Sequence, residues 1–239
     1  MVLRLVRPPP RLTCSGPVAT LARMTGSGGE AMAATRVVAP VLPASYVARD
    51  HLLGPLRAAV DDPRVALVLV SAPAGAGKTT LLAGLAHDPG HGQNRDVAWL
   101  QVEAVDRDPT RFWTDVALAV EGVRPGTAEA VTTVARSTGG AGEAMVPVLV
   151  NLLDTGPPIV VVFDDLHLVD NPAVYDGLTL LLERLPPQVT LAVGTRVDPP
   201  LRPIRARRHT TSTGRWSWPA GRSAHSTPGT CTPSPPTSG

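Results

Sequence analysis

The sequence feature that most constrains the fold is a short turn of small residues between an aliphatic run and an apolar segment with helical spacing. Residues 72–79 of this turn read Ala-Pro-Ala-Gly-Ala-Gly-Lys-Thr. The aliphatic run Val65–Val70 before them has the length and composition of a strand buried on both faces. The segment from 78 to 86 has the spacing of a helix. A strand, a tight loop and a helix are therefore predicted in that order.

The turn approximates the phosphate-binding pattern G-x-x-x-x-G-K-[ST]. In this pattern backbone N–H groups surround a polyphosphate, and the following helix adds the positive end of its dipole. Lys78 is the only lysine among 22 basic residues, and it would reach the β- and γ-phosphates as a compact charge that arginine replaces poorly. Thr79 would place its hydroxyl on Mg²⁺. The predicted nucleotide-binding residues are Ala74, Gly75, Ala76, Gly77, Lys78, Thr79 and Thr80.

One residue of the turn departs from the pattern. Ala72 stands where the pattern has its first glycine, and alanine fits there only with a negative φ. The alternative is a Gly/Ala-rich connection that carries its lysine by chance. The order of strand, loop and helix favours phosphate binding over that alternative.

An apolar run at 159–163 is followed directly by two carboxylates, Asp164 and Asp165. The pattern is typical of the acidic strand of nucleotide-binding ATPases. Asp164 is predicted to bind Mg²⁺, and Asp165 is predicted to polarise the attacking water. The alternative is that Asp165 or Asp170 caps the next helix.

Two further polar residues follow strand patterns. Arg196 comes after the run 189–194, and we predict that it senses or stabilises charge on the γ-phosphate. A solvated surface arginine is the alternative. His167 could face the γ-phosphate, but we favour packing of the loop as its role.

Strand and helix patterns alternate over residues 44–208. Further strands are predicted at 96–102, 159–163 and 189–194, and further helices at 48–60, 112–120 with Pro109 at its start, 142–153 and 172–185. Alternation of this kind indicates a parallel sheet flanked by helices on both faces. The predicted fold class is α/β, a P-loop NTPase domain.

Both ends of the chain lack such patterns. Residues 1–43 are rich in Pro, Gly, Ala and Arg, and we expect them to be disordered or to belong to a mis-annotated extension, since Met24 and Met32 are alternative starts. Residues 209–239 are rich in Ser, Thr, Pro, Gly and Arg. We expect this tail to be disordered, with an out-of-frame origin as our hypothesis.

Composition excludes several classes of protein. A hydrophobic content of 43% is too high for a chain that is disordered throughout. No run of about 18 apolar residues predicts a spanning helix, and the N-terminus lacks the apolar region of a secretory signal. Cys14 and Cys231 form no disulfide or metal framework. The expected setting is cytoplasmic, without a membrane partner.

The central region, about residues 44–208, resembles the nucleotide-binding domain of the large ATP-dependent LuxR-family transcription activators of MalT type, which are signal-transduction ATPases with numerous domains. The block Asp106–Trp113 is the most family-specific stretch, and alanine at position 72 is common in the family. The other stretches that carry the resemblance are 71–75, 77–82, 97–100, 163–167 and 194–201. The stretch 47–52 resembles a family segment that lies near the adenine.

The resemblance implies ATP and Mg²⁺ as cofactors, slow hydrolysis, and self-association through the ATPase domain. It also implies DNA binding through a C-terminal helix-turn-helix, for which residues 209–239 leave no room. A member of the family has a fifth strand after this region, so we expect the sheet to lack its last strand and to leave an unpaired edge.

Three functions stay open at this point: an ATP-binding switch module, a general P-loop ATPase of another family, and an inert truncated fragment. Nucleic-acid binding by the arginines at positions 202–222 is a weaker alternative, because part of that set belongs to a solvated domain edge.

Overall fold

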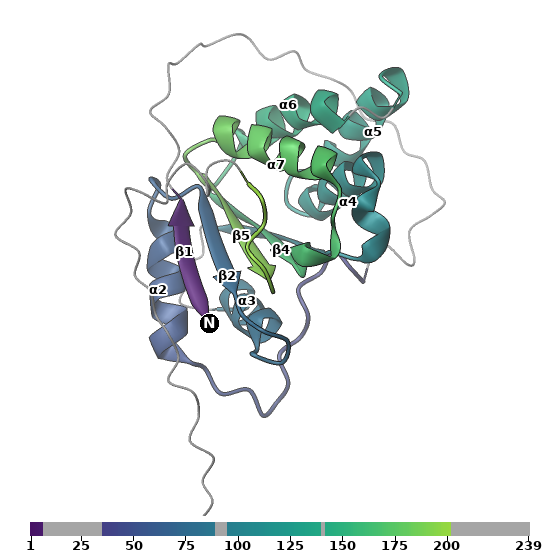
Figure 1. The fold of residues 1–239 in the computed structure, drawn as a ribbon. Coiled ribbons are helices and arrows are strands. Elements are labelled where there is room, and N and C mark those ends of the chain that lie inside the picture. Colours follow the sequence, from purple (N-terminus) through teal and green to yellow (C-terminus); the bar gives the residue numbers. More distant parts are fainter. Residues whose placement is uncertain (7–34, 89–94, 140–141, 202–239) are drawn as a thin grey trace, which may run out of the picture.

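The computed structural model describes residues 1–6, 35–88, 95–139 and 142–201. Within them, five strands form one sheet in the order β1-β2-β5-β4-β3 (Figure 1). The strands are β1 (Val2–Val6), β2 (Leu67–Ser71), β3 (Asp96–Gln101), β4 (Ile159–Asp164) and β5 (Val189–Thr195). β2, β5, β4 and β3 are parallel, whereas β1 runs antiparallel to β2.

Helices cover both faces of the sheet, with α4, α5, α6 and α7 on one side and α2 and α3 on the other (Figure 1). The helices are α2 (Asp50–Asp61), α3 (Lys78–Ala86), α4 (Pro109–Glu121), α5 (Thr127–Ser137), α6 (Gly142–Leu153) and α7 (Pro172–Arg184), with 3-10 turns η1 (Ala104–Arg107) and η2 (Leu166–Leu168). This is a P-loop ATPase-like α/β fold, and the predicted fold class is confirmed.

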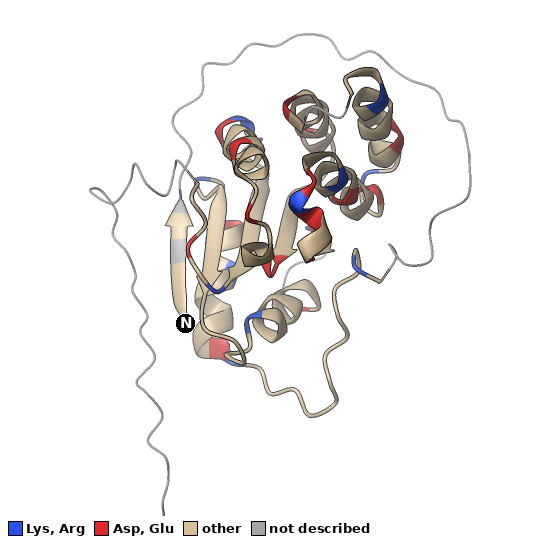
Figure 2. Ribbon diagram, turned by 45° about the vertical axis from the view of Figure 1, so that its right-hand side comes forward, with Lys and Arg blue, Asp and Glu red and all other residues tan. Residues whose placement is uncertain are grey.

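The two faces of the strands feed two apolar cores. On β2, Leu67 and Leu69 pack toward α4–α7, and Val68 and Val70 pack toward α2 and α3. Since side chains alternate across a strand, a strand covered on both faces reads as an unbroken aliphatic run. The strands are almost entirely without charge, and charged residues lie on the helices and loops (Figure 2).

Helix starts follow local chemistry. Asp108 accepts a hydrogen bond from the Arg111 N–H at the start of α4, and Asn171 accepts one from Ala173 at the start of α7. Each cap is followed by a proline at the first helical position, where no N–H is needed. Asn171 thus caps α7, and the alternative role of Asp165 or Asp170 as its cap is wrong.

The expectation of disorder over residues 1–43 is wrong for two stretches. Val2–Val6 forms β1, because its main chain pairs with the free edge of β2 from Val2 opposite Ser71 to Val6 opposite Leu67. Residues 35–43 also have a described structure, and Val37, Ala39 and Leu42 pack against the two cores. The β2 edge of the sheet is therefore paired with β1. Residues 7–34 and the predicted tail 209–239 lie outside the described residues.

No helix among the described residues is both long and apolar enough to cross a membrane.

Candidate functional site

The predicted phosphate-binding loop, residues 72–79, follows the carboxyl end of β2. Because β2, β5 and β4 are parallel, the carboxyl ends of β4 and β5 lie at the same end of the sheet. The loop begins at Ala72, whose N–H donates to the Thr195 carbonyl of β5 at 3.2 Å. Gly75 and Gly77 have φ values of 73° and 82°. Only glycine adopts such left-handed angles at little cost, so these two residues let the chain reverse into α3.

Gly77 occupies the N-cap position of α3 and has no side chain with which to bond the first N–H groups of the helix. Those groups have no partner inside the helix. The helix therefore points N–H groups that have no intrahelical partner, and the positive end of its dipole, at the loop.

Lys78 is the first residue of α3 and is only 6% exposed. Its Nζ donates to the carbonyl oxygens of Ala72 and Pro73 at 3.1 and 3.2 Å. The ammonium group is thus held across the loop by neutral acceptors. An anion in the loop would find this charge already oriented.

Asp164 ends β4 and is fully buried. Its Oδ1 accepts the Asp165 N–H at 3.1 Å, whereas its Oδ2 has no hydrogen-bond partner among the described residues. Burial raises the pKa of this carboxyl. The Thr79 hydroxyl lowers the pKa, the negative charge of Asp165 raises it further, and the positive charge of Lys78 lowers it. A buried carboxylate oxygen with no donor is suited to a cation.

Gly194 on β5 makes room for this carboxylate. A Cβ atom at Gly194 would lie 2.5 Å from Asp164 Oδ1. The sequence placed Gly194 in a strand and in a stretch of family resemblance, but gave it no role at the site. A glycine inside an otherwise aliphatic strand signals such a close approach, and that signal was available.

Asp165 is the only non-glycine residue with a positive φ in the described part of the chain, at 59°. Its Oδ2 accepts a hydrogen bond from Gln101 Nε2 at 3.2 Å, and its Oδ1 lies 3.7 Å from His167 Nδ1. A backbone angle of this kind costs free energy and persists only where surrounding contacts impose it. Gln101 was not recognised from the sequence.

His167 is 10% exposed at its side chain, and neither ring nitrogen has a hydrogen-bond partner among the described residues. Burial lowers the pKa of its imidazole, Asp165 opposes this, and the charges of Arg196 and Lys78 add to the lowering. The structure thus brings Lys78, Asp165 and His167 within electrostatic reach of one another. Arg196 follows β5 with an exposed side chain near the same edge.

A pocket of about 380 Å³ adjoins the loop on the side of α2 and α3. Arg49 lines this pocket, and its Nη1 donates a hydrogen bond to the Ala76 carbonyl at 3.4 Å. Tyr46 packs on Gly84, where a Cβ would lie 2.5 Å from the phenol oxygen. The pocket is lined by Pro43, Ser45, Tyr46, Val47, Arg49, Gly77, Thr80 and Leu81. Of these, the sequence pointed to Gly77 and Thr80 directly and to 47–52 by resemblance.

The fold and this loop define the class: an α/β domain of the P-loop ATPase type. Among curated proteins, the chain is 30% identical over 165 residues to the HTH-type transcriptional regulator MalT of Yersinia enterocolitica. It is 31% identical over 165 residues to the MalT regulators of two Klebsiella pneumoniae strains. Each match covers 68% of this chain and 17% of the relative.

The matched region is accordingly similar to one part of the MalT regulators, and the chain spans about a sixth of the length of these relatives. A comparison with models of protein families found no match. Among solved structures, that of the Aeropyrum pernix ORC1 protein in complex with DNA is similar with a TM-score of 0.43 and 23% identity, over 65% of this chain and 40% of that one.

Proposed function

We propose that this domain binds Mg-ATP and acts as a nucleotide-dependent switch in a MalT-like transcription regulator, with slow ATP hydrolysis. One observation carries the proposal. The loop after β2 brings a buried lysine and the start of a helix next to a buried carboxylate whose Oδ2 has no donor among the described residues.

The phosphates would lie in the loop 74–80. Glycines at 75 and 77 keep the backbone open to a close approach, and the N–H groups at the start of α3 face the loop. Lys78 would exchange its two carbonyl partners for phosphate oxygens, which are stronger acceptors because they are charged.

Thr79 and Asp164 fit a magnesium ion. Mg²⁺ prefers hydroxyl, carboxylate and water oxygens, and the Asp164 Oδ2 offers a carboxylate oxygen that is free of other donors among the described residues. When bound, the ion would neutralise charge on the β- and γ-phosphates.

The base and ribose would occupy the pocket beside the loop. Its wall is formed by apolar and aromatic groups from 43–47 and α3, and the loop residue Gly77 joins it to the phosphate site. A mostly apolar wall next to an anion site matches the two halves of a nucleotide.

Hydrolysis would use Asp165 to polarise water and Arg196 to stabilise charge on the γ-phosphate. The exposed position of Arg196 leaves it free to turn toward a ligand. For the whole regulator we propose a cytoplasmic setting, self-association through this domain and DNA contacts through another part of such a protein.

Thermal unfolding of the 239-residue chain with and without Mg-ATP tests the proposal. Ligand that binds only the native state stabilises it by about 2.7 kcal/mol at a hundredfold excess over Kd. We expect a clear rise in Tm for the wild type and none for Lys78→Ala.

Arg64→Ala is the matched control for the loss of a basic side chain. Arg64 is 69% exposed and pairs with Asp62 before β2, away from the carboxyl ends of the strands. It should respond to Mg-ATP like the wild type. Absence of any Mg-ATP effect on the wild type would contradict the proposal and favour an inert fragment. Rapid sustained turnover would favour a general P-loop ATPase over a switch.

A further inference from the structure

His167 is a buried polar side chain to which the proposed mechanism gives no role. It lies in η2, the turn that follows the two acids at the end of β4, and η2 packs against β5 and η1. The Leu168 N–H donates to the Asp165 carbonyl at 3.0 Å, and Leu166 is fully buried. The turn therefore holds the imidazole at a set place beside the carboxyl ends of β4 and β5.

The imidazole has no hydrogen-bond partner among the described residues, at Nδ1 or at Nε2, although its side chain is only 10% exposed. Asp165 Oδ1 lies 3.7 Å from Nδ1, which is too far for a hydrogen bond. A neutral imidazole has one N–H donor and a protonated one has two. In either form, at least one donor of His167 lacks an acceptor in the part of the chain that the structure describes. Buried donors are normally paired, so this one is suited to an acceptor that a ligand supplies.

The charges around the ring favour an anionic ligand. Burial lowers the pKa of the imidazole, the charge of Asp165 raises it, and the charges of Arg196 and Lys78 lower it further. The two cations come from neighbouring elements, because the loop before Lys78 is bonded to the end of β5 through the Ala72 N–H. An anion placed among these groups would meet two positive charges and a free N–H donor.

The neighbours of His167 select one part of the proposed nucleotide. In the proposed function Lys78 meets the β- and γ-phosphates, Arg196 meets the γ-phosphate and Asp165 meets the attacking water. His167 is within electrostatic reach of all three, and it does not line the pocket proposed for the base and ribose. The acceptor that fits this position is the γ-phosphate, which ADP lacks.

We propose that His167 donates a hydrogen bond to the γ-phosphate and thereby makes the domain discriminate ATP from ADP. The inference rests on the proposed function, from which it takes the nucleotide site. The negative charge of a bound phosphate favours the protonated ring. Such a ring donates to the phosphate from one nitrogen while the other stays toward Asp165. In the ADP complex that hydrogen bond is not formed.

The test measures the Kd values of the 239-residue chain for Mg-ADP and for the Mg²⁺ complex of the β,γ-imido analogue of ATP, by calorimetric titration. His167→Phe keeps a planar ring, His167→Leu has a smaller apolar group, and both lose the two nitrogens. Loss of one hydrogen bond to a charged group should weaken binding of the analogue about tenfold and change the Kd for ADP less than about twofold. The ligand-free Tm should stay at or above that of the wild type, because the ring has no hydrogen bond to lose among the described residues.

Two further variants separate a hydrogen bond from a change of shape. His167→Gln keeps an N–H donor on a side chain of similar reach, so it should retain most of the discrimination. His87→Phe is the matched control. His87 Nε2 is hydrogen-bonded to the Pro40 carbonyl at 3.0 Å and lies at the C-terminal end of α3, away from the loop. This variant loses the same ring and should leave the ratio of the two Kd values unchanged.

Equal losses of affinity for both nucleotides in the apolar His167 variants, or no loss for either, overturn the γ-phosphate contact. A His167→Gln variant that behaves like His167→Phe also overturns it, as does a His87→Phe variant that shifts the ratio equally. A wild-type chain that binds neither nucleotide overturns the proposed function together with this inference.

Discussion

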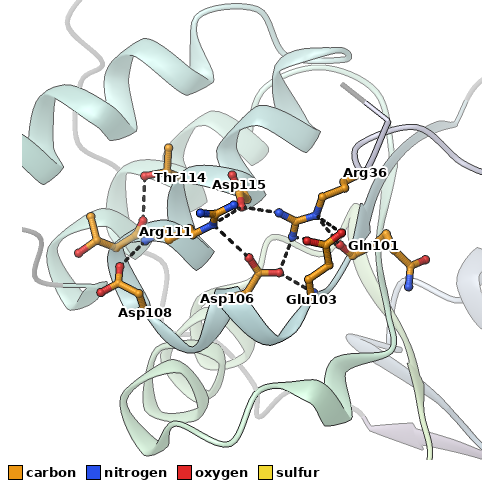
Figure 3. A network of polar contacts seen from close by, with 9 residues as sticks. Arg36, Gln101, Glu103, Asp106, Asp108, Arg111, Thr114 and Asp115 are labelled. Carbon is orange, nitrogen blue, oxygen red and sulfur yellow. Dashed lines mark hydrogen bonds and ion pairs between the residues drawn. The ribbon is translucent and has the colours of Figure 1, made fainter. Parts of the chain in front are cut away.

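The two flanks of β4 are both rich in buried charge, but they differ in how that charge is satisfied. On the β5 flank, Lys78 donates to two backbone carbonyls, and Asp164 keeps an oxygen without a donor among the described residues. On the β3 flank, Arg36 pairs with Asp106 and Asp115, and Asp106 Oδ1, which has no hydrogen-bond partner among the described residues, still has the Arg111 Nε charge 3.8 Å away (Figure 3).

The difference separates the proposed ligand site from a structural one. Buried polar groups are normally paired, and a buried charge with no counter-charge on its free oxygen is a candidate place for a bound ion. A buried ion pair supplies its own counter-charge and contributes to the folded structure instead. Substitutions on the β5 flank should therefore change binding, and those on the β3 flank should change stability.

The largest expected effect is on the β3 flank. Arg36→Met leaves Asp106, a fully buried carboxylate, without its closest cation, and removal of one partner of a buried pair costs about 3 to 5 kcal/mol. Urea unfolding should show this loss. Arg107→Met, which breaks an exposed pair with Asp170, should cost less than about 1 kcal/mol. Equal costs would remove the distinction between the flanks.

The next effect is on the β5 flank. Asp164→Asn should weaken Mg-ATP binding by about tenfold to a hundredfold, because one charged ligand of the ion is lost. The ligand-free variant should unfold at a slightly higher temperature, because burial disfavours the wild-type charge. Calorimetric titration and thermal unfolding measure the two changes. A variant with normal affinity and lower stability would place Asp164 with the structural charges.

Asp165 directly follows β4, between the two flanks. Asp165→Asn should lower kcat by about tenfold or more, since a general base contributes at least that much, and should leave the Kd for Mg-ATP within about twofold. Single-turnover hydrolysis measures the first quantity and fluorescent-ATP titration the second. An equal loss in affinity would assign Asp165 to binding.

The smallest effect is a pH dependence on the β3 flank. Burial raises the pKa of Asp115. The charge of Arg36 lowers the pKa, that of Asp106 raises it, and that of Arg111 lowers it. A carboxyl with a raised pKa in the folded state binds protons there more tightly, so it lowers stability as pH rises above its unfolded value of about 3.9. Relative to wild type, Asp115→Asn should therefore gain stability with rising pH. Urea unfolding at several pH values measures this, and a constant difference would contradict the assignment.

The sequence predicted the strand order along the chain, most helices and the loop, because these follow from patterns within a few residues. It did not predict α5, whose sequence is rich in Thr and Val, residues of weak helix propensity. The helix forms because Val131 and Ala135 are buried against its neighbours. β1 was missed for a similar reason, since only the open edge of β2 stabilises it.

What the sequence determined by itself is the local chemistry: glycines that turn the chain, one lysine at the start of a helix and two acids after a strand. Only the tertiary structure decided what each of those acids contacts. Asp164 occupies the space left by the missing side chain of Gly194, and Asp165 accepts a hydrogen bond from Gln101. The main chain of Gln101 is in turn bonded to Arg36, which is distant in the sequence. Contacts between distant residues depend on how the strands are ordered in the sheet, and no local pattern encodes that order.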